Sequence, residues 1–298
     1  MRKYQSLLAA LLATSLATAA QGGAHLSAAE AEAKVAALEK RVGGRIGLYA
    51  LNTRTGVTLE HRAGERFAMC STFKWLLAAA VQARAVDSGP AGLSLATRIP
   101  YGEAELHGWA PVTREHLKDG AMTVEALADA AVELSDNGAA NLLLPLVGGP
   151  RGLTGWLRER GDRVTRVDRN EPTCNTNLRG DPRDTTTPAA SAADLRALLL
   201  GDALPRPARE RLTASMERTR TGDKRLRAGL PPGSRVADKT GTCDRGAVND
   251  LAVVWGNGDE VFVIAAYLSD SGRPAEELEP AHAELARIVL RALARNRW

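Results

Sequence analysis

The sequence predicts an α/β protein of the α+β type, in which both chain ends build one antiparallel sheet flanked by helices, with an inserted all-helical lobe. Strand patterns occur near the two ends of the chain, and helical periodicity dominates between them. The 298 residues, of which 44% are hydrophobic, are enough to form a packed core in each of two lobes. The terminal helices are expected to cover the sheet.

The N-terminal elements follow from local signals. Ser27 can cap a helix over residues 28–42, in which apolar side chains recur on one face. Residues 45–51 and 56–61 then show the residue pattern of two short strands, and the turn-forming "NTRT" lies between them. This arrangement is typical of a β-hairpin.

The middle of the chain is predicted to be helical. Residues 71–86 form a long helical run, and the apolar residues of 123–134 recur at i, i+3, i+4, i+7 and i+8. The stretch 163–188 is different, because it has poor periodicity and many turn formers, so it is either a functional loop or disordered. Further helices are expected near 137–146, 151–159, 188–200 and 205–218.

Strand patterns return at about 235–242, 249–256 and 261–268, and a helix beginning at Pro274 closes the chain. We therefore expect an α/β lobe made of residues 27–66 and 218–298, and a helical lobe made of residues 67–217. A site is expected in the cleft between these lobes.

The first 20 residues resemble a cleavable signal peptide, with a basic start at Arg2 and Lys3 and an apolar stretch that is too short to span a bilayer. We expect an exported protein without stable membrane association. The formal net charge of +4 comes from scattered residues rather than a basic stripe, so nucleic acid is not an expected partner. The histidine and cysteine spacings predict no metal site and no cofactor.

Ser71 and Lys74 lie three residues apart at the predicted start of a helix. One helical turn brings the lysine nitrogen toward the serine hydroxyl, and the helix N-terminus favours a serine alkoxide and a developing oxyanion. Taken alone, the pattern S-x-x-K is weak, since an N-cap followed by a surface lysine is the favoured explanation of that pattern by itself.

Two further motifs strengthen the interpretation. "SDN" at Ser135–Asn137 falls between two predicted helices, and "KTGT" at Lys239–Thr242 ends a predicted strand. The three motifs in this order form the set found in penicillin-recognising serine enzymes. From about residue 27 to the C-terminus, the chain resembles the class A serine β-lactamases.

The long loop extends this resemblance. "RNEPTCN" contains Arg169, Glu171 and Asn175, which is similar to the R-x-E-x-x-x-N loop of that family, and Asp184 stands where the family has the salt-bridge partner of the arginine. The resemblance implies that Glu171 deprotonates a water that Asn175 positions. A charged, solvated loop is the alternative explanation of these residues alone.

The resemblance implies acyl transfer to Ser71, with Lys74 or Glu171 acting through water as the acylation base. Ser135 would relay a proton, and the backbone N–H groups of Ser71 and Thr242 would form the oxyanion hole. A β-lactam is the implied substrate, with D,D-peptidase and non-enzymatic β-lactam sensor as rival functions. The implied substrate-binding residues are Asn137, Asn175, Lys239, Thr240, Thr242, Arg225 and, at the cleft mouth, Trp109, for which partly buried packing is the alternative.

The three cysteines can pair in an oxidising compartment, which leaves one of them over. Cys70 and Cys243 match two cysteines that form a disulfide in the class A carbapenemase subgroup. The resemblance therefore implies a Cys70–Cys243 disulfide, a free Cys174 and carbapenem hydrolysis. It also implies a monomer located in the bacterial periplasm or secreted.

Overall fold

The computed structural model describes residues 25–89 and 92–295. Its centre is a five-stranded antiparallel sheet with the strand order β2-β1-β9-β8-β7. The N-terminal β1 pairs with the C-terminal β9 in a register that sets Leu48 opposite Ala266. This confirms the sheet predicted from both chain ends. The strands are β1 (Arg45–Asn52), β2 (Thr58–His61), β7 (Arg235–Cys243), β8 (Ala247–Trp255) and β9 (Val261–Ser269).

Alternation along the strands divides the apolar side chains between two cores. In β9, Ile264 and Leu268 belong to the core beneath the terminal helices, whereas Val263 and Tyr267 belong to the core on the opposite face. Successive side chains of a strand point to opposite faces, so one strand can supply both cores. The sheet is therefore a middle layer with helices on both sides.

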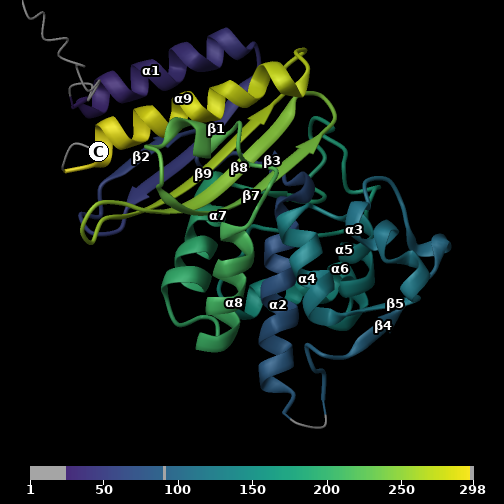
Figure 1. Cartoon of the computed structure of the whole chain (residues 1–298). Coiled ribbons are helices and arrows are strands. Elements are labelled where there is room, and N and C mark those ends of the chain that lie inside the picture. Colours follow the sequence, from purple (N-terminus) through teal and green to yellow (C-terminus); the bar gives the residue numbers. More distant parts are fainter. Residues whose placement is uncertain (1–24, 90–91, 296–298) are drawn as a thin grey trace, which may run out of the picture.

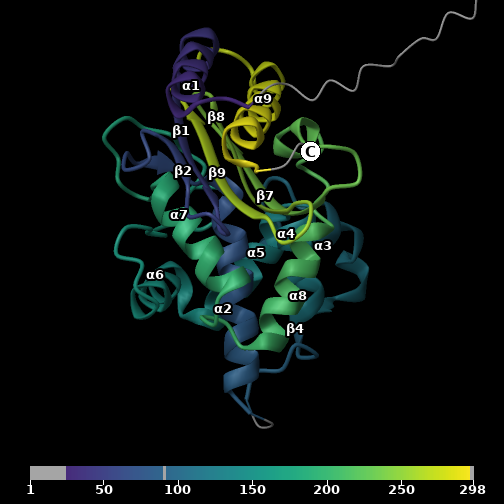
Figure 2. The ribbon, with the colours of Figure 1, turned by 90° about the vertical axis from the view of Figure 1, so that its left-hand side faces the viewer.

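The terminal helices α1 (Ala28–Val42) and α9 (Ala275–Leu293) lie together on one face of the sheet (Figures 1 and 2). Ser27 caps α1 as predicted, and its side chain forms a capping box with Glu30. The apolar stripe of α1, which includes Val35 and Leu38, is buried toward the sheet.

Helices of the middle segment occupy the other face (Figures 1 and 2). Helix α2 (Phe73–Asp87) runs through their centre, and its residues from Phe73 to Ala83 are all buried. A helix that is apolar on every side can be stable only when other elements surround it. Those elements include α4 (Val124–Glu133), α5 (Asn137–Leu143), α6 (Gly149–Glu159) and α8 (Arg206–Glu217). Helix α3 (Pro111–Glu115) packs on α4 and α5, and α7 (Pro188–Leu195) packs on the sheet.

Several local details differ from the sequence-based expectation. Ser71 lies in a short 3-10 turn, Cys70–Thr72, and α2 begins only at Phe73. Two small sheets also form, in which β3 (Phe67–Ala68) pairs with β6 (Thr185–Thr186) and β4 (Arg98–Pro100) with β5 (Ala121–Thr123). These strands are too short for alternation to reveal them, and tertiary pairing alone defines them.

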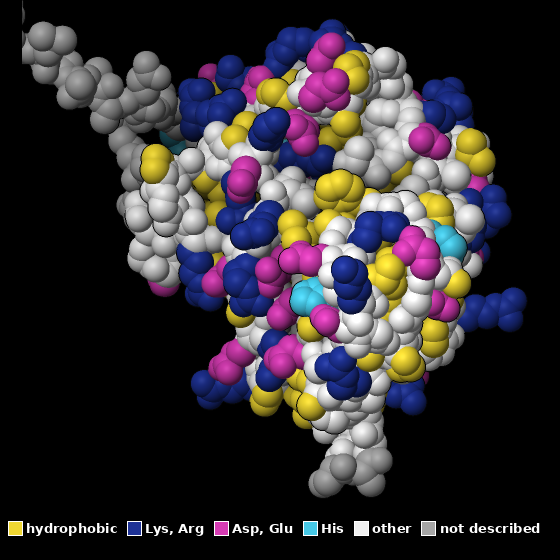
Figure 3. Space-filling view, turned by 45° about the vertical axis from the view of Figure 1, so that its right-hand side comes forward, with side chains coloured by type: hydrophobic (Ala, Val, Ile, Leu, Met, Phe, Trp, Pro, Cys, Tyr) yellow, Lys and Arg dark blue, Asp and Glu magenta, His cyan; other side chains and the backbone are white. Residues whose placement is uncertain are grey.

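The signal-peptide prediction for residues 1–20 lies outside the described residues, and the lobe boundaries stay a prediction. Within the described parts of the chain, none of the helices combines the length and the apolar character needed to cross a membrane. On the face shown in Figure 3, basic and acidic side chains are interspersed. The scattered charge predicted from the sequence is visible there.

Candidate active site

Ser71 and Lys74 lie together where the 3-10 turn runs into α2. The Lys74 Nζ donates a hydrogen bond of 3.0 Å to the Ser71 Oγ. Cys70, directly before the serine, has a positive φ of 50°. This backbone conformation is uncommon for a residue other than glycine and is found at sites where surrounding structure enforces it.

The Lys74 ammonium is fully buried, and polar groups from three segments surround it. Its Nζ lies 2.9 Å from the Glu171 Oε1, 2.7 Å from the Ser135 carbonyl oxygen and 2.6 Å from the Asn137 Oδ1. Burial lowers the pKa of Lys74, and the Glu171 carboxylate opposes this effect. A lysine in such surroundings can give up a proton more readily than a solvated one.

Ser135 connects this lysine to a second one. It has a positive φ of 58° in the short link between α4 and α5, and its Oγ accepts a hydrogen bond of 3.1 Å from the Lys239 Nζ. Burial shifts the pKa of Lys239 well below its ordinary value, and the nearby Lys74 charge adds to the shift. The two lysines and two serines thus form one hydrogen-bonded group at the bottom of the site.

The "SDN" segment is held by its middle residue. The Asp136 side chain caps α5 through the Ala139 N–H at 2.8 Å, and it also accepts from the N–H groups of Val112 and Thr113 at 2.9 Å. The Asn137 Oδ1 accepts a hydrogen bond from the Lys74 Nζ, and the Asn137 Nδ2 donates to none of the described groups. That amide nitrogen is the part of Asn137 able to bind a substrate.

Glu171 reaches the nucleophile from the long loop. The Ser71 Oγ lies 3.4 Å from the Glu171 Oε1, to which it donates, while the Asn175 Nδ2 donates to the Glu171 Oε2. The Asn175 Oδ1 is buried, and among the described residues it has no hydrogen-bond partner. A buried acceptor of this kind beside a carboxylate is suited to hold a water molecule.

The loop is attached to the helical part by an asparagine that the sequence analysis did not select. The Asn141 Oδ1 accepts from the Glu171 N–H at 3.0 Å, and its Nδ2 donates to the Glu171 carbonyl at 2.9 Å. Asn141 follows Asn137 by one helical turn on α5. This spacing to the "SDN" motif is the one signal in the sequence that could have indicated it.

Arg169 and Asp184 close the loop at its base. The Arg169 Nε lies 2.5 Å from the Asp184 Oδ2, and the two side chains are 18% and 4% exposed. The Asp184 Oδ1 also accepts from the N–H groups of Asp168 and Arg169, at 2.7 and 3.0 Å. The ion pair expected from the resemblance is present and nearly buried.

Strand β7 forms the opposite wall, at the edge of the sheet. At Gly241 an added Cβ would lie 2.6 Å from the Met69 carbonyl oxygen and 3.1 Å from the Thr72 nitrogen. Only glycine therefore allows the strand to approach the turn that carries Ser71 so closely. The predicted disulfide between Cys70 and Cys243 is confirmed, with a Cα–Cα distance of 5.7 Å.

Cys174 is free, as expected, and it is buried. It lies in the loop close to Glu171, and burial, followed by the Glu171 charge, raises the pKa of its thiol. Among the described residues, no cluster of three or more His, Cys, Asp or Glu side chains could hold a metal ion.

The other residues predicted to bind the substrate, Arg225, Thr240 and Trp109, differ in how far they are buried and in which groups they contact. Arg225 is buried behind β7, where its Nη2 donates to the Thr242 Oγ1 at 2.7 Å, so its contact with the cleft passes through Thr242. The Thr240 Oγ1 lies 2.6 Å from the Thr221 Oγ1. Trp109 is 61% exposed, with its indole N–H bonded to the Leu134 carbonyl, so it is not the partly buried packing residue considered as the alternative.

Comparison with known proteins identifies relatives of this arrangement. Residues 30–293 match the family model described as the β-lactamase enzyme family. The chain is 45% identical over 262 residues to the carbapenem-hydrolysing β-lactamase KPC of Klebsiella oxytoca, covering 88% of each chain. It is 45% identical over 290 residues to β-lactamase L2 of Stenotrophomonas maltophilia, covering 97% of this chain and 94% of that protein.

A solved structure of the reconstructed last common ancestor of Gram-negative class A β-lactamases is also similar. It has 52% sequence identity and a TM-score of 0.84, and the match covers 87% of this chain and 98% of that one. The similarity thus extends over both the sheet and the helical part.

Proposed function

Since the chain belongs to the β-lactamase enzyme family, we propose that it is a class A serine enzyme that hydrolyses the β-lactam amide bond through an acyl-enzyme on Ser71. The observation that supports this most strongly is the pair of contacts at Lys74. Its Nζ is 3.0 Å from the Ser71 Oγ and 2.9 Å from the Glu171 carboxylate. One lysine thus links the nucleophile to the group that would serve the second step.

In the first step the Ser71 oxygen attacks the lactam carbonyl carbon, and its proton passes to Lys74 or, through water, to Glu171. Burial lowers the pKa of Lys74, which supports a neutral amine as acceptor. The Glu171 Oε1 lies 3.4 Å from the Ser71 Oγ, so this carboxylate is also near enough to receive the proton. The carbonyl oxygen would accept hydrogen bonds from the N–H groups of Ser71 and Thr242, each worth roughly 3 kcal/mol in the transition state.

The C–N bond then breaks, and the leaving nitrogen takes a proton from the Ser135 hydroxyl. Lys239 supports this role, because its Nζ lies 3.1 Å from that hydroxyl, and the proton taken from Ser71 can return to Ser135 through the hydrogen-bonded group that contains both lysines. Lys239, Thr240 and Thr242 would hold the substrate carboxylate. Arg225 would lie behind the strand and orient the Thr242 hydroxyl, without contacting the substrate itself.

In the second step a water attacks the ester carbonyl carbon and Glu171 takes its proton. The ester bond then breaks, and the leaving Ser71 oxygen becomes a hydroxyl by taking a proton back from Glu171, whose Oε1 lies 3.4 Å away. The Asn175 Nδ2 bonds to Glu171 and leaves its buried Oδ1 able to accept from that water. Asn137 would bind the side-chain amide of the substrate, and Trp109 would border the cleft mouth. A group placed for deacylation argues for turnover over permanent acylation.

Intact-mass spectrometry of the protein mixed with penicillin tests this function. We expect a transient adduct of one penicillin on Ser71, followed by ring-opened product in many-fold excess over protein. A persistent adduct without turnover would favour a D,D-peptidase or a β-lactam sensor instead. Failure of Ser71→Ala to remove the adduct would contradict the assignment of the nucleophile.

Carbapenem hydrolysis is a separate, finer proposal. It rests on the Cys70–Cys243 disulfide beside the nucleophile and on the 45% identity to a relative named as carbapenem-hydrolysing. We expect ultraviolet absorbance of a carbapenem to fall through many turnovers with purified protein. Trapping of the protein by carbapenems, with penicillin turnover intact, would remove this proposal and leave the general function untouched.

A further inference from the structure

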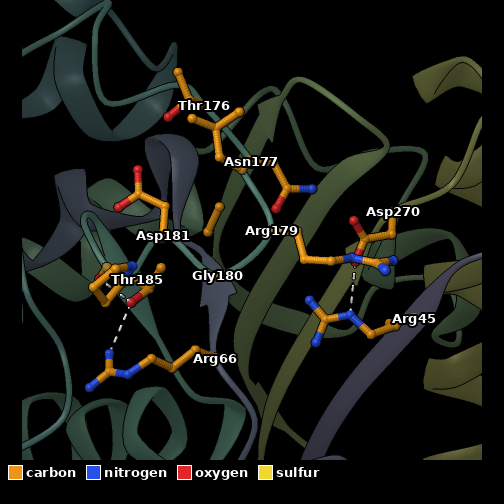
Figure 4. Close-up of a pocket in the computed structure, with 12 residues that line it drawn as sticks. Arg45, Arg66, Thr176, Asn177, Arg179, Gly180, Asp181, Thr185 and Asp270 are labelled. Atoms are coloured by element: carbon orange, nitrogen blue, oxygen red, sulfur yellow. Dashed lines mark hydrogen bonds and ion pairs between the residues drawn. The ribbon is translucent and has the colours of Figure 1, made fainter.

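A second cavity lies outside the active site, under the later half of the Glu171 loop. Its volume is about 490 Å³, within the range of small-molecule sites. Loop residues 176–182 form one wall, and Arg45 of β1, Arg66 before β3 and Asp270 after β9 form the other. In Figure 4, the Arg66 side chain reaches toward Thr185 on one side of the cavity, while Arg45 bonds to Asp270 on the other side, toward which Arg179 also extends from the loop.

The charged groups that line this cavity are three arginines and two aspartates. Asp270 bonds to the Arg45 Nε at 2.9 Å, and Arg45 also pairs with Glu65. Asp181 is paired with Arg183 at 2.8 Å, and these hydrogen bonds lower the pKa of Asp181 to about 2. Both lining carboxylates are therefore already neutralised by a cation.

Two arginines remain without a carboxylate. Arg66 donates to neutral oxygens only, the Thr185 Oγ1 at 2.9 Å and the Val164 carbonyl at 3.0 Å. Arg179 makes no ion pair and no hydrogen bond through its side chain to any residue the structure describes. A guanidinium carries five N–H donors in a planar fork that matches phosphate and carboxylate oxygens. This cavity thus presents unused donors from two directions.

We propose that this cavity binds a small polyanion with two anionic groups, one held by Arg66 and the other by Arg179. Such a ligand would join the loop to the body of the protein, because Arg179 belongs to the loop whereas Arg45 and Arg66 do not. At present the later half of the loop is tied to the sheet through Asn177, whose Nδ2 lies 3.0 Å from the Ser269 Oγ. Occupancy would add a second attachment to the segment that carries Glu171.

Pyrophosphate is the probe with the required pair of charged groups, and orthophosphate is the matched single-group anion. Isothermal titration in chloride buffer of equal ionic strength should show saturable pyrophosphate binding, about tenfold tighter than orthophosphate. Arg179→Ala and Arg66→Ala should each weaken the binding of pyrophosphate by about tenfold or more. Arg179 has no partner to lose among the described residues, so its variant should fold as the parent does.

Arg84→Ala is the matched control, since it also removes one exposed arginine that makes no described side-chain contact, on α2 away from the cavity. It should bind pyrophosphate as the parent does. Protein acylated at Ser71 by a slowly released β-lactam should also bind pyrophosphate, because the two sites are separate. This control distinguishes the cavity from the lysines of the active site, and the binding readout does not depend on hydrolysis.

Three results would overturn the proposal: no saturable binding by the parent, equal affinity in Arg179→Ala and the parent, or loss of binding on acylation. A rise in melting temperature alone would not suffice, because phosphate anions stabilise proteins generally by exclusion from their surfaces. The decisive quantity is therefore the difference in pyrophosphate affinity between the Arg179→Ala and Arg84→Ala variants.

Discussion

The two walls of the active site are held by different kinds of forces. The wall behind the nucleophile consists of the Cys70–Thr72 turn, the edge strand β7 and the disulfide that joins them. The facing wall is the loop of residues 168–184, which depends on the Arg169–Asp184 pair and a few side-chain hydrogen bonds. The first wall is covalent and continuous with the sheet, whereas the second is irregular and polar.

This difference matches the two chemical steps. Acylation needs Ser71 and the oxyanion donors at fixed positions, and a rigid wall favours such preorganisation. Deacylation depends on one carboxylate that arrives from the loop, so it depends on contacts that single substitutions can remove. Loop changes should therefore affect deacylation selectively, and changes at the nucleophile wall should affect stability and acylation together.

The largest expected effect is that of Glu171→Ala. Removing the general base should slow deacylation by about 10²–10⁴-fold while Ser71 is still acylated by at least some substrates. Rapid-quench mass spectrometry with penicillin should show the adduct accumulating. Unchanged steady-state hydrolysis would show that the loop does not supply the base.

The disulfide should have the next largest effect, on stability. It closes a separation of 173 residues, for which the chain-entropy model gives about 5 kcal/mol at most. Cys70→Ala combined with Cys243→Ala should lower the free energy of unfolding measured in urea. The rate of acylation should also fall, because the turn that carries Ser71 would lose its covalent link to β7.

Thiol counting on the parent protein supports the same test. Under denaturing, non-reducing conditions we expect one reactive thiol per chain, mapped to Cys174. Cys174→Ala is the control for cysteine removal as such, and it should leave the disulfide intact. Three reactive thiols, or an unchanged urea midpoint in the double variant, would contradict a stabilising bridge.

A smaller effect is expected from Asp184→Asn. The substituted amide cannot accept on both sides, so the Arg169 guanidinium loses a charged partner in a nearly buried position. We expect a loss of about 1–3 kcal/mol in unfolding free energy, and a greater fall in deacylation than in acylation. Single-turnover kinetics separates the two steps.

Asp181→Asn is the matched control, because Asp181 pairs with Arg183 in the same loop but the arginine is 49% exposed. An exposed pair is worth under about 1 kcal/mol, so both stability and deacylation should stay close to the parent values. Equal effects of the two substitutions would show that burial of the Arg169–Asp184 pair is not what holds the loop.

Much of the site could be predicted because its motifs lie on regular elements. Ser71 and Ser135 lie next to helix ends and Lys239 lies within strand β7, and the spacing of S-x-x-K predicts the contact between Ser71 and Lys74. The helical spacing of Asn141 to Asn137 places it beside the motif, but its contact with Glu171 depends on the loop that folds against α5. The position of Arg225 behind β7 could not be predicted either, because no local sequence pattern shows on which side of a strand a distant arginine packs.

The sequence by itself determined the helices and long strands, the shared sheet and the order of the motifs, since local periodicity and residue type carry that information. The Cys70–Cys243 pair was implied only by the resemblance to a known family. The tertiary structure decided which groups share a proton or a charge. Lys74 contacts Glu171, which lies 97 residues later in the chain, and Arg179 lines the same cavity as Arg45 and Arg66 only because the loop folds back onto the body of the protein. Burial in that arrangement shifts the pKa values of both lysines, and burial is a property of the packed chain rather than of any segment.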